Sequence, residues 1–305
     1  MSRFVIGVDV GGTNIKLGIV KSSGSISARS FLKTERYISH PKILIEILVT
    51  QIRELMSIGR IQRHQVVGIG IGLPGLINPP AGIVEFLPNI PGWCKVPLRR
   101  YLQVALKIPV FLENDVNLIT LGEWRFGAGR GFKNMICLTL GTGVGSGLIL
   151  DNALYRGEGF VAGELGHMPL NENGPRCTCN GVACFERYVG NHALAAEAAR
   201  RFRRTIRLED VTALARQGHA KAIRFWEDTG VRIGRGLIGT VNLLNPTLII
   251  IGGGVSNAPS FVLKIIERTI KSRAMKVQAS MVKVVRAALG TDAGIIGARV
   301  LVAGR

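Results

Sequence analysis

The sequence predicts an α/β fold divided into two domains, and three observations lead to this prediction. A glycine-rich turn between two apolar runs occurs twice, at residues 9–16 and 141–147. Short aliphatic runs typical of buried strands are separated by amphipathic stretches with apolar residues at helical spacing. The chain of 305 residues is also long enough to form two hydrophobic cores.

Each glycine-rich segment is predicted to form a β-hairpin, at residues 4–20 and 135–150. Glycines in a turn allow successive backbone N–H groups to point into one concavity, which suits anionic oxygens. Two such turns facing each other would hold a chain of phosphates between two domains. Neither segment matches a Walker loop or a dinucleotide-binding fingerprint. An ordinary tight hairpin is the alternative interpretation of each turn alone.

The remaining elements follow from periodicity and turn residues, which also place a domain boundary near residue 116. The proline-rich stretch 77–93 is predicted to be a long binding loop. The predicted domains are 1–116 with the C-terminal helix of 291–305, and 117–290. The expected strands are 66–73, 108–112 and 247–251, and the expected helices are 41–58, 118–126, 193–204, 231–243 and 292–302.

Composition narrows the classes of partner. The formal net charge is +19, which raises the question of nucleic acid or an anionic membrane. The basic clusters at 99–100, 200–207 and 271–276 are interpreted as solvated helix faces, because few aromatic residues accompany them. Nucleic-acid binding is therefore not expected. No apolar stretch is long enough to span a bilayer and no signal peptide is evident, so a cytoplasmic location is expected.

Asp115 is the candidate catalytic base. It lies in the polar cluster Glu113-Asn114-Asp115 just after a predicted strand, where α/β folds place chemistry. A carboxylate there can accept the proton of an attacking hydroxyl during phosphoryl transfer. Helix capping is the alternative role, since Asn and Asp are favoured N-caps.

Three of the five cysteines are crowded into residues 177–184, and His167 precedes them by ten residues. One imidazole and three thiolates from Cys177, Cys179 and Cys184 would complete a tetrahedral structural zinc site. Thiols in a loop with nothing bound are the alternative. Cys94 and Cys137 are isolated, and both are expected to be buried apolar residues.

Together these motifs resemble the ROK family of sugar kinases, over essentially the whole chain. The resemblance rests on the motifs of both glycine-rich turns and the polar cluster, followed by G-E-x-G-H, C-x-C…C-x-E and G-G-G. They lie at residues 9–16, 113–117, 141–145, 163–167, 177–186 and 252–254. It implies the actin-like (ribonuclease H-like) two-domain ATPase fold with a cleft between the domains. It also implies that the protein phosphorylates a hexose with ATP and is most like glucokinase. Homodimers or homotetramers are implied as well.

The resemblance assigns roles by position. Asp115 would deprotonate the 6-hydroxyl of the sugar, and Asp9 would position Mg²⁺. The implied sugar-binding residues are Asn114, Glu164, His167, Glu186, Gly75 and Asn89. The implied ATP-binding residues are Gly11, Gly12, Thr13, Lys16, Thr142, Gly143, Gly253 and Gly254. His167 would contact the sugar with one ring nitrogen and zinc with the other.

The zinc loop departs from the family pattern C-x-C-G-x-x-G-C-x-E, because Asn180 and Ala183 replace its glycines. Asn tolerates positive φ but Ala does not, so strain or a different loop shape is expected at Ala183. The preferred hexose stays open among glucose, N-acetylglucosamine, N-acetylmannosamine, allose and fructose, as does polyphosphate in place of ATP. A sugar-responsive transcriptional regulator of the family is less favoured, because only eight residues precede Asp9. A sugar-binding protein without catalysis is the third hypothesis.

Overall fold

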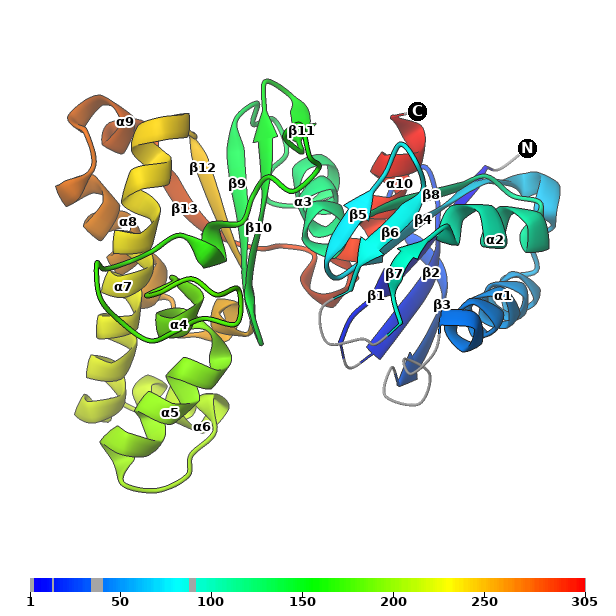
Figure 1. Cartoon of the computed structure of the whole chain (residues 1–305). Helices are drawn as coiled ribbons and strands as arrows, with labels where there is room; N and C mark the ends of the chain where they lie inside the picture. Colours follow the sequence, from blue (N-terminus) through cyan, green and yellow to red (C-terminus); the bar gives the residue numbers. More distant parts are fainter. Residues whose placement is uncertain (1–2, 13, 34–40, 88–91, 305) are drawn as a thin grey trace. The chain divides into compact units, whose positions relative to one another are not determined.

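The computed structural model describes residues 3–12, 14–33, 41–87 and 92–304. It divides into two compact units, shown with the sequence colours in Figure 1. Unit 1 comprises residues 1–131, 154–162 and 289–305, and unit 2 comprises residues 132–153 and 163–288. No helix among the described residues is both long enough and apolar enough to cross a membrane.

Unit 1 is built on a mixed sheet with the strand order β3–β2–β1–β4–β8. The first three strands form antiparallel pairs, whereas β4 and β8 run parallel to β1. The first predicted hairpin is present as β1 and β2, with Asp9 opposite Lys16 in the register. The strand bounds are Phe4–Val10 (β1), Asn14–Val20 (β2), Ile26–Lys33 (β3), Val66–Leu73 (β4) and Val110–Asn114 (β8).

Helices cover both faces of this sheet. The core between the sheet and α1 and α2 is aliphatic, with Leu44, Leu48 and Leu102 fully buried. The other face is covered by α10, which also packs against α3. Their backbones come so close that a Cβ on Gly297 would collide with the carbonyl oxygen of Leu118. The helix bounds are Pro41–Ile58 (α1), Leu98–Leu106 (α2), Asp115–Phe126 (α3) and Ala293–Ala303 (α10).

The prediction of a loop over residues 77–93 is wrong in its first half. The small antiparallel sheet β5–β6–β7 forms there from Leu76–Asn78, Ile83–Phe86 and Cys94–Val96. Pro79 and Pro80 lie in the turn between β5 and β6, so these prolines end a strand without preventing the sheet. Cys94 is exposed on β7, contrary to expectation, whereas Cys137 is buried as predicted.

Unit 2 contains the strands β10, β9, β12 and β13 of a second sheet, whose full order is β11–β10–β9–β12–β13. The second predicted hairpin is its β9–β10 pair, and β12 runs parallel to β9 as β4 runs parallel to β1. Each sheet thus has a glycine-turned hairpin followed by parallel strands in the same order. The bounds are Met135–Leu140 (β9), Val144–Leu150 (β10), Ala153–Tyr155 (β11), Leu248–Gly253 (β12) and Lys283–Arg286 (β13).

The helices of unit 2 surround the long helix α7, which packs against α8 and α6 (Figure 1, yellow and neighbouring colours). Buried Phe225, Trp226 and Leu237 of α7 contribute to one aliphatic and aromatic core. The bounds are Glu186–Val189 (α4), Asn191–Phe202 (α5), Leu208–Arg216 (α6), Ala220–Leu244 (α7), Phe261–Arg273 (α8) and Lys276–Met281 (α9).

The division into units differs from the predicted boundary near residue 116. The whole of α3 belongs to unit 1, because it packs against α10 and β4. This helix also begins at Asp115, three residues before the predicted start. The C-terminal segment from Leu289 is part of unit 1.

Candidate functional site

The first glycine turn connects β1 and β2 in unit 1. The N–H of Gly11 donates to the carbonyl of Asn14 at 2.9 Å, which closes the turn, and Gly12 is exposed with open space around its Cα. Lys16 on β2 donates to the carbonyl of Thr291 at 3.3 Å, just before α10. The predicted ligand Thr13 lies outside the described residues.

Asp9 is half-buried at the end of β1. Burial raises the pKa of this carboxyl group, and the neighbouring charge of Lys16 lowers it by a smaller amount. A Cβ on Gly294 would come within 2.9 Å of the Asp9 carboxyl carbon, so glycine leaves room for this side chain. A carboxylate with little solvation beside a turn of exposed backbone is a suitable ligand for Mg²⁺.

The second glycine turn connects β9 and β10 in unit 2, with Thr142 and Gly143 exposed. The N–H of Gly141 donates to the carbonyl of Gly143 at 2.9 Å, and the N–H of Asn191 donates to the carbonyl of Gly141 at the same distance. The start of α5 therefore holds this turn. Glycine is required at Gly253, where φ is +75° and a Cβ would collide with the carbonyl of Leu140.

Glu186 is bonded to the second glycine turn. Its Oε2 accepts the N–H of Val144 at 2.8 Å. One oxygen of this predicted sugar ligand is thus committed to the backbone of the turn. Glu186 therefore connects the residues implied for the sugar with those implied for the phosphates, a link that sequence spacing did not indicate.

A pocket of about 290 Å³ lies in unit 2 beside Gly254. Asn191, Thr212 and Trp226 contribute to its lining. The indole nitrogen of Trp226 is buried and has no hydrogen-bond partner among the described residues. A pocket of this size next to a predicted adenosine contact is suited to a nucleoside. Sequence reasoning found only its glycine edge, because most of the other lining residues come from α5, α6 and α7.

Asn114, rather than Asp115, is the N-cap of α3. Its side-chain oxygen accepts the N–H groups of Val116 and Asn117 at 2.9 and 3.2 Å, and its amide donates to the carbonyl of Gly75 at 3.3 Å. Asp115 is the first residue of the helix and is half-buried. The capping alternative therefore applies to its neighbour. Asn89, another predicted sugar ligand, lies outside the described residues.

Glu113, immediately before this cap, is a buried carboxylate that sequence reasoning did not assign a role. Its Oε2 accepts Nε of Arg156 and lies 2.7 Å from both Nε and Nη2 of that residue. Its Oε1 accepts the N–H of Asn114 at 3.1 Å and the amide of Asn117 at 3.0 Å. Both oxygens are satisfied, which is the condition for burying a charge. This ion pair fixes the end of β8, and Asp115 follows directly as the first residue of α3.

His167 lies between Glu164 and the cysteine cluster in unit 2. Its Nδ1 is 3.7 Å from Sγ of Cys177, and its Nε2 is 3.9 Å from Oε2 of Glu164. One nitrogen thus faces the sulfur atoms and the other faces a predicted sugar ligand. This arrangement is what the two proposed contacts of His167 require.

The four predicted zinc ligands lie together. The ligand atoms of His167, Cys177, Cys179 and Cys184 are all within 4.8 Å of one another, with 3.6 Å between the sulfurs of Cys179 and Cys184. Zinc–sulfur bonds of about 2.3 Å in a tetrahedron separate sulfur atoms by roughly 3.8 Å. The donor set and its spacing fit a closed structural zinc site.

The thiols of this cluster are inequivalent. Burial disfavours ionisation of Cys177, but hydrogen bonds, first from the Cys179 backbone, lower its pKa to about 7. Burial and hydrogen bonding to Cys179 raise the pKa of Cys184 to about 12. The anticipated strain is present, because φ is +68° at Asn180 and +57° at Ala183, which is fully buried. The loop therefore adopts positive φ at two positions that carry side chains.

The model of the ROK family matches residues 5–305. The chain belongs to the ROK family. A glucokinase from Streptomyces coelicolor is 33% identical over 311 residues, which cover 96% of this chain and 95% of that protein. This ROK chain has the actin-like ATPase fold of the family, as the sequence predicted.

Two further relatives show the range of activities among similar proteins. A ROK family glucokinase from Streptomyces griseus, solved in complex with glucose and AMPPNP, is 30% identical with a TM-score of 0.82. The match covers 97% of this chain and 98% of that chain. A xylose repressor from Bacillus spizizenii is 30% identical over 294 residues, which cover 96% of this chain and 75% of the repressor.

Proposed function

We propose that this ROK protein is an ATP-dependent hexose kinase that transfers the γ-phosphate to the 6-hydroxyl of glucose. The observation that carries the proposal is the repeated sheet, each copy with its own glycine-turned hairpin. Two turns whose backbone N–H groups can each donate to phosphate oxygens suit a nucleotide better than a single anion site does. The match to glucokinases over nearly the whole chain supports the sugar-kinase class.

In the proposed reaction, a carboxylate oxygen of Asp115 accepts the proton of the sugar 6-hydroxyl. The sugar oxygen forms a bond to the γ-phosphorus as the bond from phosphorus to the β-bridging oxygen breaks, and ADP leaves. Asn114, Glu164, His167, Glu186 and Gly75 are the described residues proposed to bind the sugar. Positioning and charge stabilisation account for most of the catalysis in reactions of this class.

The phosphates of ATP are proposed to lie against Gly11, Gly12 and Lys16 in unit 1 and Thr142 and Gly143 in unit 2. The nucleoside would occupy the pocket beside Gly254, with Gly253 supplying the close backbone approach. Asp9 would hold Mg²⁺, which neutralises phosphate charge when bound. Zinc held by His167 and the three cysteines would fix the orientation of the imidazole.

A coupled assay of ADP release with Mg-ATP and a panel of hexoses tests the proposal. Glucose is expected to give the highest kcat/KM, and N-acetylglucosamine, N-acetylmannosamine, allose and fructose lower values. Polyphosphate replaces ATP in a parallel series. A higher kcat/KM for an N-acetylated hexose would support the assignment as a kinase but contradict glucose as its preferred substrate.

The repressor relative makes a sugar-responsive regulator the second candidate. If calorimetry detects sugar binding but no hexose gives ADP release from ATP, the regulator is favoured over the kinase. The cytoplasmic location and the dimeric or tetrameric state stay predictions.

A further inference from the structure

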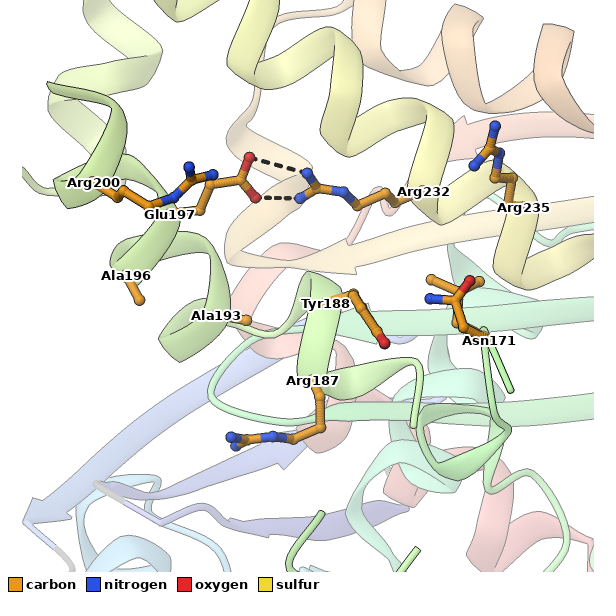
Figure 2. Close-up of a pocket in the computed structure, with 10 residues that line it drawn as sticks. Asn171, Arg187, Tyr188, Ala193, Ala196, Glu197, Arg200, Arg232 and Arg235 are labelled. Atoms are coloured by element: carbon orange, nitrogen blue, oxygen red, sulfur yellow. Dashed lines mark hydrogen bonds and ion pairs between the residues drawn. The ribbon is translucent and has the colours of Figure 1, made fainter. Parts of the chain in front are cut away.

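Two carboxylates that the proposed reaction does not use each join segments far apart in the sequence. Half-buried Glu197 on α5 accepts both terminal nitrogens of Arg232 on α7, and Figure 2 shows this pair beside a pocket of about 560 Å³. Glu197 therefore links two helices inside unit 2. Glu123 on α3 is fully buried and differs, because its carboxylate accepts backbone N–H groups near points where the chain passes between the units.

The first segment that Glu123 holds follows α3. The carbonyl of Glu123 accepts the N–H groups of Gly127 and Gly129 at 3.1 and 2.8 Å. Its carboxylate oxygen Oε2 accepts the N–H of Ala128 at 2.9 Å. A Cβ on Gly127 would lie 2.1 Å from this oxygen, so glycine leaves room for the carboxylate. The chain leaves unit 1 after residue 131, and these bonds fix the turn that precedes the crossing.

The second segment is the one by which the chain returns to unit 1 at Leu289. The N–H of Leu289 donates to Oε1 of Glu123 at 2.8 Å, although the two residues are 166 positions apart. A short 3₁₀ helix, Gly290–Asp292, follows and leads directly into α10, which packs against α3. One buried carboxylate thus holds an exit and a return of the chain at the ends of two packed helices.

The returning segment also contacts two side chains of the β1–β2 hairpin. The carbonyl of Thr291 accepts Nζ of Lys16 at 3.3 Å. A Cβ on Gly294, near the start of α10, would come within 2.9 Å of the Asp9 carboxyl carbon. Lys16 is a proposed phosphate ligand and Asp9 the proposed Mg²⁺ ligand. The place of residues 289–294 therefore affects where both side chains can lie.

We propose that Glu123 is a positioning residue for nucleotide binding, which holds residues 289–294 where they orient Lys16 and Asp9 toward the phosphates of ATP. This inference rests on the proposed function, because both side chains belong to the proposed ATP site. The bonds described above involve none of the residues proposed to bind the sugar. Loss of the Glu123 carboxylate should therefore weaken nucleotide binding and leave sugar binding unchanged.

Glu123→Gln tests the proposal, because an amide has one acceptor oxygen and cannot accept both N–H groups. Glu267→Gln is the matched control. Glu267 lies on α8 in unit 2, and its Oε2 likewise accepts a backbone N–H, that of Val284 at 3.0 Å. Calorimetry with Mg-ADP and with glucose is run on the full chain, together with hydrogen exchange of residues 289–294.

Glu123→Gln is expected to bind Mg-ADP about tenfold more weakly than the parent, the effect of losing one hydrogen bond to a buried acceptor. Its affinity for glucose should match that of the parent. In the coupled assay the KM for Mg-ATP should rise while the KM for glucose stays unchanged. Exchange of residues 289–294 should be faster than in the parent. The control should match the parent in nucleotide affinity and in the exchange of these residues.

A second pair of variants perturbs the same segment without touching the buried carboxylate. Gly290 has a φ of +56° and is exposed, and a Cβ there would meet nothing within 4 Å, so Gly290→Ala strains the segment without a collision. Gly218, exposed between α6 and α7 with a φ of +88° and equally open surroundings, supplies the control Gly218→Ala. Gly290→Ala should weaken Mg-ADP binding about fivefold, and the control should bind like the parent.

Three results would overturn the proposal. In Glu123→Gln, parent-like exchange of residues 289–294 or parent-like affinity for Mg-ADP would show that the carboxylate does not position the nucleotide site. An equal loss of affinity for glucose and Mg-ADP would assign Glu123 a general structural role instead. A parent that binds no Mg-ADP would overturn the proposed function and this inference with it, whereas failure of the variants to differ from a parent that binds Mg-ADP would overturn the inference alone.

Discussion

Replacing Arg156 with methionine should destabilise unit 1 far more than removal of an exposed arginine does. The change leaves the Glu113 carboxylate, whose side chain is 2% exposed, without its cation. Breaking a buried ion pair from one side costs about 3–5 kcal/mol. The Arg156 side chain is 25% exposed, so water can reach part of the vacated space and we expect about 3 kcal/mol.

A double-mutant cycle isolates the ion pair from lost packing. Glu113→Gln removes the charge and is expected to cost about 2 kcal/mol, because it leaves Arg156 facing an amide. Once residue 113 is neutral, Arg156→Met strands no charge. The double variant should therefore lose about 3 kcal/mol rather than the sum, a coupling of roughly 2 kcal/mol.

Hydrogen exchange of the β8 amides measures these losses within unit 1, which avoids treating a two-unit chain as one cooperative transition. Arg29→Met is the control, since its ion pair with Asp292 is exposed and should contribute about 0–1 kcal/mol. If Arg156→Met loses no more than this control, or the two changes are additive, the buried pair does not stabilise the end of β8.

Three further predictions concern the zinc loop and the first glycine turn. Ala183→Gly relieves a positive φ but loses a buried methyl group, so it should change the free energy of unfolding by less than about 1 kcal/mol. The control Ala198→Gly, in the interior of α5, should cost about 2 kcal/mol. Equal losses of the two variants in urea denaturation would contradict strain at Ala183. Elemental analysis should find about one zinc per chain, with kinase activity lost on chelation or in Cys179→Ser, and active protein without zinc would contradict the structural role. Burial raises the pKa of Asp9 in the folded chain, so its charge destabilises the fold at neutral pH and this penalty disappears as the pH falls toward the ordinary aspartate value. Asp9→Asn should therefore melt at a higher temperature than the parent at pH 7, with the difference shrinking in acid, and a lower melting temperature at pH 7 would contradict this account.

The parts of the fold that local pattern specifies were predictable. Both hairpins are encoded by glycines between apolar runs, and the helix at 41–58 and the strand at 66–73 have the predicted bounds. The grouping of His167 with the three cysteines was predictable because Cys and His side chains at short spacing have few other common roles. The strain at Ala183 followed from a missing glycine.

Features that depend on distant residues were not predictable in this way. Arg156 is 43 residues from Glu113, and nothing local distinguishes it from other basic residues. The helix α3 was assigned to the second domain because its packing on α10 joins segments far apart in the sequence. Arg200 is exposed on α5, as the predicted solvated face requires, and it also lines a pocket completed by α4 and α7, which the sequence did not indicate. The prolines after β5 led to the prediction of a loop where a small sheet forms, because prolines occur at strand ends as well as in loops.

The most direct test of the central claim compares Asp115→Asn with the parent and with Asp151→Asn, a control at an exposed turn. The account predicts that Asp115→Asn lowers kcat for glucose about 10²–10⁴-fold, the usual contribution of a general base, while the dissociation constant for glucose by calorimetry stays near that of the parent. The control should match the parent in both quantities. Parent-like turnover by Asp115→Asn would contradict the assignment of this carboxylate as the base.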